Sequence, residues 1–441
     1  MLKNLLANIA LYKKAIFFLS ILPTVSILIG FYAQNFAFKE TAEPFIFRSP
    51  ISNRTLRASE IQGVSSSSAD ENINEVAQTQ ATLTARPRKE VGTKEEPKAV
   101  TVTAKTNRIN FPNNKFGVHT FANEEEMDLA AQLVNSNGGD WGWVTMTMDI
   151  NERNSGKWNS LFTKLLDKHL IPIVQLSNNG KIPSEDEIEG IGAFLSGLGW
   201  PVKIRPVTVF SEVNASEYWG GKIDPEGYAR ILNKVVESFK GKSQEFFIMN
   251  GAFNASARTG SSEIGCIKTD LGVDTCYLSE IEFLKRMEAT VPGIFKKLDG
   301  WAVHSYPHPA YKGRPSDTRI GAESAFEAGR NTIRSYQFEL RLLSTFGVNI
   351  PVFITETGWP HREGKTERAE WYDKETVAQY YGEAFRDIFL PDSRVVAITP
   401  FILKYDSYDN FAFISSSGEK FPQWNTILSF TKTAGSPPVN R

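Results

Sequence analysis

The chain has 441 residues, 41% of them apolar, which is enough to bury the core of one large domain and leave additional segments. Its 49 Lys and Arg residues nearly balance its 50 Asp and Glu residues, so the formal net charge is -1. This balance argues against a nucleic-acid partner, because it provides no overall positive field.

The amino-terminal segment 1–36 predicts a cytoplasmic start and a transmembrane anchor. Its stretch 15–33 has no charged residue, and about 19 such residues suffice to cross a bilayer. The lysines before it favour a cytoplasmic amino end; they are Lys3, Lys13 and Lys14. A cleaved signal peptide is the alternative, although cleavage after Ala33 would place Phe31 where a small residue is needed. In both cases the rest of the chain is expected outside the cytoplasm, either anchored in the membrane or secreted.

Segment 37–106 predicts a disordered linker. Between Arg48 and Asn110 the chain has no Phe, Trp or Tyr, and positions 65–68 are consecutive serines. Such a stretch cannot bury enough apolar surface to offset the entropy lost on ordering. We therefore expect a tether before a folded domain at 107–432, with a flexible tail at 433–441.

From residue 107 onward the sequence alternates apolar strands with amphipathic helices. The strand candidates are 116–119, 143–148, 171–176, 207–212, 246–250, 301–306, 352–356 and 395–401, and the helical patterns include 225–239, 322–346 and 376–389. Alternating strands and helices predict an α/β fold with a parallel sheet, and this number of strands is that of a (β/α)8 (TIM) barrel. A doubly wound open sheet is the alternative, but no Gly-rich phosphate turn follows the first strand.

The chain has two cysteines, Cys266 and Cys276. Outside the cytoplasm, a pair this close in sequence is expected to close one loop as a disulfide, whereas in a reducing compartment both would be free thiols. A metal site needs more ligands than this pair supplies, and the 5 histidines of the chain provide none nearby. We expect neither a metal centre nor a cofactor.

Two glutamates stand at the ends of two predicted strands. Val352 and Ile354 alternate toward Glu356, and turn residues follow at 358–360. The run 206–212 ends in the same way at Glu212. The carboxyl ends of barrel strands meet at one rim, where (β/α)8 enzymes carry their chemistry. Two carboxyl groups there suit the hydrolysis of a glycosidic bond, in which one protonates the leaving oxygen and the other attacks the sugar.

The sequence around these glutamates resembles the clan A glycoside hydrolases, which are retaining (β/α)8 enzymes with glutamates on the fourth and seventh strands. The run Thr-Glu-Thr-Gly-Trp-Pro at 355–360 is most similar to the nucleophile segment of the β-1,3-glucanases in that clan. The run Ser-Glu-Val at 211–213 resembles their acid/base segment, and the segments 301–307 and 409–424 also resemble parts of the clan. The resemblance covers about residues 107–431.

The resemblance implies a double-displacement mechanism with retention, in which Glu356 is the nucleophile and Glu212 the acid/base. In that clan an Asn normally stands directly before the acid/base and bonds the sugar hydroxyl beside the reacting carbon. This chain has Ser211 there, and its shorter hydroxyl cannot make both amide contacts. Asn214 is a candidate replacement for that amide.

Further side chains near the predicted rim are candidates for holding substrate. Tyr306 is expected to donate a hydrogen bond to Glu356, and His119 and His304 to bind sugar hydroxyls. Trp219 and Trp359 are candidates for stacking against sugar rings, because flat apolar rings match the C–H faces of sugars.

The sequence thus predicts an exported, membrane-anchored glycoside hydrolase that acts on a β-linked oligo- or polysaccharide. Its other partner is the membrane itself, through residues 15–33. A non-catalytic barrel that binds glycan is the alternative favoured by Ser211, and a transglycosylase would use the same two glutamates.

Overall fold

The computed structural model describes residues 111, 114–254, 263–268, 274–308, 311–318, 325–366 and 369–440. The predicted start and anchor at 1–36 and the predicted linker at 37–106 lie outside these residues. Within the described ranges, no helix has the length and apolar character needed to cross a membrane.

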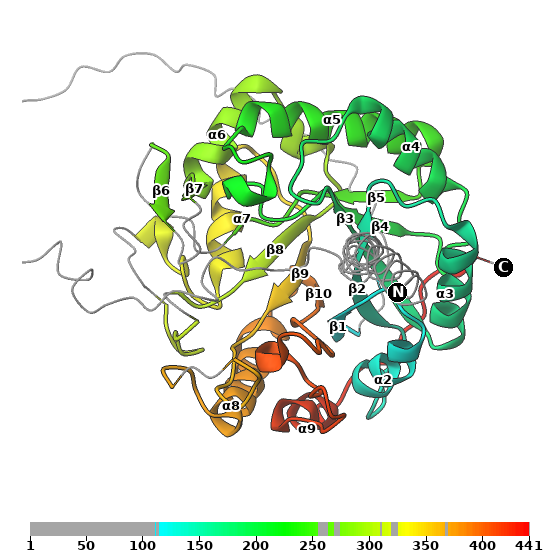
Figure 1. The fold of residues 1–441 in the computed structure, drawn as a ribbon, viewed down its shortest axis with the longest axis vertical. Helices are drawn as coiled ribbons and strands as arrows, with labels where there is room; N and C mark the ends of the chain where they lie inside the picture. Colours follow the sequence, from blue (N-terminus) through cyan, green and yellow to red (C-terminus); the bar gives the residue numbers. More distant parts are fainter. Residues whose placement is uncertain are drawn as a thin grey trace, which may run out of the picture. The chain divides into compact units, whose positions relative to one another are not determined.

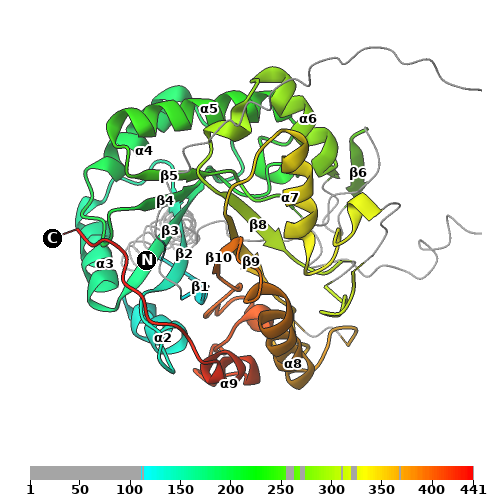
Figure 2. The same ribbon diagram turned by 180° about the vertical axis from the view of Figure 1, so that it is seen from behind.

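The centre of the domain is a closed barrel of parallel strands surrounded by helices (Figures 1 and 2). Among the described residues, the barrel strands are β1 (Gly117–Thr120), β2 (Gly142–Asp149), β3 (Leu170–Ser177), β4 (Arg205–Thr208), β5 (Phe246–Met249), β8 (Trp301–Ser305), β9 (Val352–Thr357) and β10 (Val395–Ile398). They pair in parallel in the orders β1-β2-β3-β4-β5 and β8-β9-β10. Two parallel bridges close the ring, Met249 with Gly300 and Phe116 with Ile398. This closure confirms the predicted (β/α)8 barrel and excludes the open sheet.

Helices follow the barrel strands and cover their outer face (Figure 1). In the described part of the chain the α-helices are α2 (Glu125–Val134), α3 (Ser155–Asp167), α4 (Glu185–Ser196), α5 (Pro225–Lys242), α6 (Glu280–Thr290), α7 (Ser335–Thr345), α8 (Lys374–Ala384) and α9 (Pro422–Ser429). Short 3-10 turns lie at Ser216–Tyr218, Ile294–Lys297, Ala325–Glu327 and Asp409–Phe411, and a π-helical turn (Phe385–Phe389) continues α8.

Local sequence accounts for several helix starts. Ser184 and Glu187 form a capping box at α4, and Asp224 accepts the Gly227 N–H at the start of α5, where Pro225 pre-sets the first helical φ. The predicted helix at 322–346 is wrong over the described residues 325–334, because α7 begins only at Ser335.

The break before α7 has a backbone cause. Gly329 has φ +91° and Asn331 has φ +57°, values in the left-handed region that a right-handed helix excludes.

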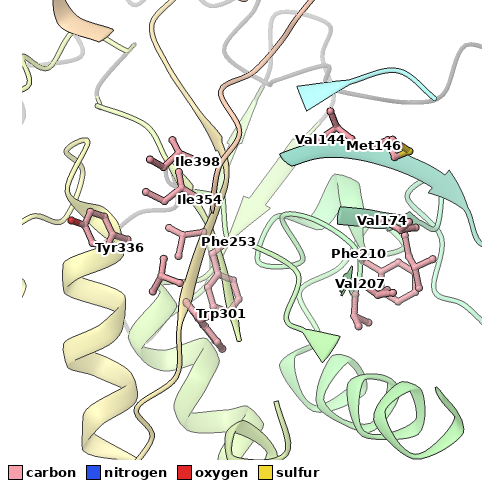
Figure 3. Packing of buried hydrophobic residues seen from close by; sticks show 14 of the residues in the cluster. Val144, Met146, Val174, Val207, Phe210, Phe253, Trp301, Tyr336, Ile354 and Ile398 are labelled. Atoms are coloured by element: carbon pink, nitrogen blue, oxygen red, sulfur yellow. The ribbon is translucent and has the colours of Figure 1, made fainter. Parts of the chain in front are cut away.

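The apolar core has two layers. An outer layer lies between strands and helices, and Figure 3 shows part of it, including Val144, Trp301 and Ile354. An inner layer fills the barrel with side chains such as Phe247, Ala302 and Phe353. Alternate residues of one strand therefore belong to different layers, as expected for a barrel.

The carboxyl-terminal segment predicted as a flexible tail is fastened to the barrel in this structure. Val439 forms an antiparallel bridge with Val202 and packs against the inner layer. The side chain of Asn440 donates hydrogen bonds to the carbonyl oxygens of Trp200 and Val202 at 3.0 and 3.1 Å. These contacts do not fit a flexible tail for residues 433–440.

A hairpin that the sequence did not predict follows β5. Its strands β6 (Gly265–Lys268) and β7 (Asp274–Tyr277) pair antiparallel, with Cys266 opposite Cys276. The two cysteines are joined in a disulfide, as predicted.

Candidate active site

Glu356 reaches the barrel interior through a bulge in β9. Ile354 pairs with Val303 of β8, but the next pair is Glu356 with His304, so β9 contains one residue more than β8 at this point. Val352 and Ile354 face the outer layer, and strict alternation would have turned Glu356 outward with them. The bulge reverses that direction. The predicted alternating face of 352, 354 and 356 is therefore wrong, although the position of the acid at the strand end is correct.

Glu212 lies in a backbone segment with unusual conformation just after β4. Phe210 has φ +70° and Glu212 has φ +52°, values that cost energy for residues other than glycine. The Glu212 N–H donates to the Ala252 carbonyl oxygen at 2.6 Å, which ties this segment to the end of β5. The side chain is buried, with an exposed fraction of 2%.

His304 lies between the two carboxyl groups. Its Nδ1 is 3.2 Å from Oε1 of Glu212, and its Nε2 is 3.5 Å from Oε1 of Glu356. Tyr306, two residues further along the chain, donates its hydroxyl hydrogen to Oε2 of Glu356 at 3.1 Å. His119 of β1 also lies near Glu356, with its Nε2 3.9 Å from Oε1. Four strands thus bring five of the predicted site residues together.

The protonation of this cluster follows from burial and mutual charge. Burial raises the pKa of Glu356 to about 8, and the charge of Glu212 adds to this, while His304, Tyr306 and Gln175 oppose it. Burial by itself lowers the pKa of His304, but the charges of Glu356 and Glu212 outweigh it and raise that pKa above its usual value.

His119 behaves differently from His304. Burial and the neighbouring His304 lower the pKa of His119 to about 3, so its imidazole is neutral. Neither of its ring nitrogens has a hydrogen-bond partner in the described part of the chain.

Two contacts of this cluster come from residues that sequence reasoning did not select. Asn254, after β5, donates its amide hydrogen to Oε2 of Glu212 at 2.6 Å. Gln175 of β3 contributes a hydrogen bond that lowers the pKa of Glu356. The sequence signal for both residues was weak: Gln175 is a single amide inside the apolar run of β3, and Asn254 is one of two asparagines that follow β5.

Asn214 and Ser211, which were also predicted to bind substrate, differ in whether their polar side-chain groups are already engaged. Asn214 is fully buried, and its amide exchanges hydrogen bonds with the backbone of Asn254, so it does not replace the missing asparagine. The Ser211 hydroxyl oxygen is buried and has no hydrogen-bond partner among the described residues.

Trp219 and Trp359 belong to the hydrophobic core rather than to an exposed rim. The Trp219 ring lies 5.3 Å from that of Tyr228, and the Trp359 ring lies 5.6 Å from that of Tyr381, measured between centroids. Their exposed fractions are 0% and 1%. Neither ring has a face open for sugar stacking, so the stacking prediction does not fit this structure.

A pocket of about 850 Å³ opens at the same end of the barrel, at the carboxyl ends of β1, β2 and β3. Phe121 and Tyr405 line it and meet edge to face, with ring centroids 5.2 Å apart. Both rings are only partly buried. Within the described ranges no group of three or more His, Cys, Asp or Glu side chains is arranged to hold a metal ion.

The solved structures to which this chain is similar include glycoside hydrolases. No protein-family model matches the chain, and no curated protein matches its sequence. Among solved structures, a fungal β-1,4-galactanase superposes with a TM-score of 0.46 at 13% identity, covering 69% of this chain and 91% of that one. An endo-laminarinase from Formosa gives a TM-score of 0.44 at 13% identity, covering 74% of this chain and 92% of that one.

A third similar structure is an endo-β-1,3-glucanase from Sorangium cellulosum, with a TM-score of 0.43 at 13% identity, covering 71% of this chain and 98% of that one. Similarity this remote concerns the course of the backbone and carries no argument about substrate. The neighbours act on different linkages, so nearness to the β-1,3-glucanases in particular is not shown.

Proposed function

We propose that this chain is a glycoside hydrolase that cleaves a β-linked glycan with retention of configuration. The observation that carries the proposal is the meeting of Glu212 and Glu356, from the ends of β4 and β9, on the two sides of His304 in the barrel mouth. Two carboxyl groups on one rim are what a double displacement at a sugar requires.

The two carboxyl groups differ in a way that suggests their roles. Oε2 of Glu356 accepts the hydrogen bond from Tyr306, whereas its Oε1 has no hydrogen-bond partner among the described residues. We assign Oε1 as the attacking atom, which bonds to the anomeric carbon while Glu212 gives its proton to the leaving oxygen. In the second step Glu212 takes a proton from water, the resulting hydroxide attacks the same carbon, and the Glu356 carboxylate is released.

Transfer of a proton from Glu356 to Glu212 makes these roles compatible with the raised pKa of Glu356. Burial raises the pKa of Glu356 to about 8 and the charge of Glu212 adds to that rise, so Glu356 holds a proton below that pH and has to release it before it attacks. The reactive arrangement has Glu356 ionised and Glu212 protonated. His304 contacts both groups, so its imidazole provides the path by which the proton reaches Glu212.

Ser211 supports a second candidate, a barrel that binds glycan without cleaving it. The amide that the clan uses beside the acid/base is absent, and Asn214 does not supply it because its own amide is engaged by Asn254. Loss of a hydrogen bond that strengthens in the transition state reduces the rate, since that bond is part of what lowers the barrier.

The pocket beside β1, β2 and β3 is the proposed location of flanking sugar units. Phe121 and Tyr405 offer partly exposed aromatic faces there, in place of Trp219 and Trp359. Aromatic rings of this kind combine apolar contact with a polar edge, which suits carbohydrate.

A glycan panel tests the proposal. The full-length chain in detergent is incubated with β-1,3-glucan, β-1,4-glucan and β-1,4-galactan. Released reducing ends indicate a hydrolase, affinity without products indicates the binder, and elongated chains indicate a transglycosylase.

Two variants and the product anomer complete this test. Glu356→Gln should abolish turnover, whereas Glu237→Gln, a matched change on the exposed face of α5, should leave it unchanged. An NMR time course should show the product anomer with retained configuration, and an inverted product would rule out the two-glutamate covalent scheme.

We also propose that the chain is exported and held at the membrane by residues 15–33. The support is the uncharged stretch and the lysines before it. In cells, the protein should remain in the membrane fraction after alkaline carbonate washing, and protease added outside should digest the domain. Recovery in the medium as a shortened chain would instead indicate a cleaved signal.

A further inference from the structure

We propose that Asn254 is a positioning residue that holds one oxygen of Glu212 and confines the catalytic proton to the other. The inference rests on the proposed function, because it concerns the acid/base of that reaction. Its basis is the hydrogen bond from the Asn254 amide nitrogen to Oε2 of Glu212 at 2.6 Å, in a site where both side chains are buried.

The chemistry of this hydrogen bond restricts the proton. An amide N–H is a donor, and it is satisfied by the lone pair of an unprotonated carboxyl oxygen. If Oε2 carried the acid proton, that hydrogen and the amide hydrogen of Asn254 would compete for the same position beside Oε2. The proton of Glu212 therefore sits on Oε1 and is donated to Nδ1 of His304, 3.2 Å away, which in this arrangement is the nitrogen without hydrogen.

Two hydrogen bonds with Asn214 hold the backbone of Asn254 in place. Its backbone N–H donates to Oδ1 of Asn214 at 2.7 Å, and its carbonyl oxygen accepts from Nδ2 of Asn214 at 3.2 Å. The Asn214 carbonyl oxygen in turn accepts the Leu278 N–H at 3.2 Å. The ends of β4 and β5 are thus locked together, so the amide of Asn254 approaches Glu212 with little freedom.

This arrangement connects the acid with the nucleophile. Oε1 of Glu212 lies 3.2 Å from Nδ1 of His304, whose other ring nitrogen lies 3.5 Å from Oε1 of Glu356, whereas Oε2 accepts the hydrogen bond from Asn254. A proton on Oε1 lies on the path between the two glutamates. A proton on Oε2 would lie off that path.

Several titratable groups lie close enough to Glu212 for its charge to shift their pKa values. They come from the turn after β4, from β8 with the residue that follows it, and from β9: Glu217, Tyr218, His304, Tyr306 and Glu356. Asn254 differs from all of these because it does not titrate. Its replacement by an apolar residue therefore removes the hydrogen bond to Glu212 without removing or adding a titrating neighbour.

The first test compares leaving groups with the full-length chain. The probes are 2,4-dinitrophenyl and phenyl β-laminaribioside, of which only the phenyl compound needs a proton from the acid when its bond breaks. Asn254→Ala and Asn254→Leu, which remove the amide and add no charge, should lower the rate with the phenyl probe by about tenfold or more, the factor that one hydrogen bond to a charged group is worth. The rate with the dinitrophenyl probe should change by less than about threefold, since Glu356 is untouched.

A matched control is available on α5, where the Asn233 amide donates to the exposed Glu237 at 2.9 Å. Asn233→Leu removes the same kind of amide donor from a glutamate away from the site and should leave both rates unchanged. Equal losses with the two probes in the Asn254 variants would mean that Asn254 only supports the fold, and would overturn the proposal.

The second test detects the protonated carboxyl group of Glu212 by infrared spectroscopy and does not depend on turnover. In chains with carbon-13-labelled Glu, the infrared band of protonated Glu212 is assigned by its absence in Glu212→Gln. Without the amide donor, the ionised form loses a partner, so the band should persist to higher pH in both Asn254 variants than in the unchanged chain. An identical titration in all three chains would overturn the proposal. If the unchanged chain cleaves no glycan and no probe, the proposed hydrolase fails, and the infrared titration still decides the role of Asn254.

Discussion

Removal of the Tyr306 hydroxyl tests the site at a single atom. Tyr306→Phe deletes the donor to Oε2 of Glu356 and leaves the ring contacts with Tyr311 and Phe411 in place, at centroid distances of 5.3 and 5.9 Å. The fold should therefore be preserved.

The size of the effect follows from the geometry. A hydrogen bond to a charged group contributes about 1.5–3 kcal/mol, and the distance of 3.1 Å is long for a hydroxyl on a carboxylate, which favours the lower end. About 1.5 kcal/mol corresponds to roughly a tenfold loss of rate and to a rise of about one unit in the pKa of Glu356. The sign is upward, because the lost donor favoured the ionised carboxylate.

The assay is the pH profile of kcat/KM for the best substrate from the glycan panel. Tyr306→Phe should be about tenfold slower than the unchanged chain at pH 7, and the alkaline limb of its profile should lie at higher pH. Tyr405→Phe, a matched removal of a phenolic hydroxyl outside the cluster, should leave the alkaline limb where it is. A rate within about twofold of the unchanged chain and an unmoved limb would show that Tyr306 only packs, and the assigned orientation of Glu356 would be wrong.

Three further predictions follow from the buried charges and the hairpin. The unchanged chain should lose activity above about pH 8, because Glu356 then has no proton to pass to the acid; activity constant to pH 10 would contradict this proton transfer. Burial raises the pKa of Glu280 from 4.5 to about 7, which corresponds to about 3 kcal/mol at most. The free energy of unfolding in urea should therefore fall as pH rises from 4.5 to 7, and Glu280→Gln should remove part of that fall. The same pH dependence in the variant and the unchanged chain would contradict this. Cys266 and Cys276 should not react with a thiol reagent in the unfolded, unreduced chain, and labelling of both by mass spectrometry would refute the bond.

Local sequence patterns were sufficient to predict the barrel but not to predict which way Glu356 faces. Alternating strands and helices depend on neighbours along the chain, so the strands around Trp301 and Val352 were predicted within a few residues. The same reasoning assigned Glu356 to the face of Val352 and Ile354. A bulge is a property of the pairing between two strands, and no pattern within one strand reveals it.

The candidate active site shows the same division between what local sequence determines and what tertiary structure decides. The sequence by itself determined which acids end the fourth and seventh strands, where the barrel lies and that Cys266 is close enough to Cys276 to pair. Only the tertiary structure decided that His304 separates the two glutamates, that Asn254 holds one of them, and that Trp219 and Trp359 pack in the core. These facts depend on distances between segments far apart in the chain, which strand closure and side-chain packing set together.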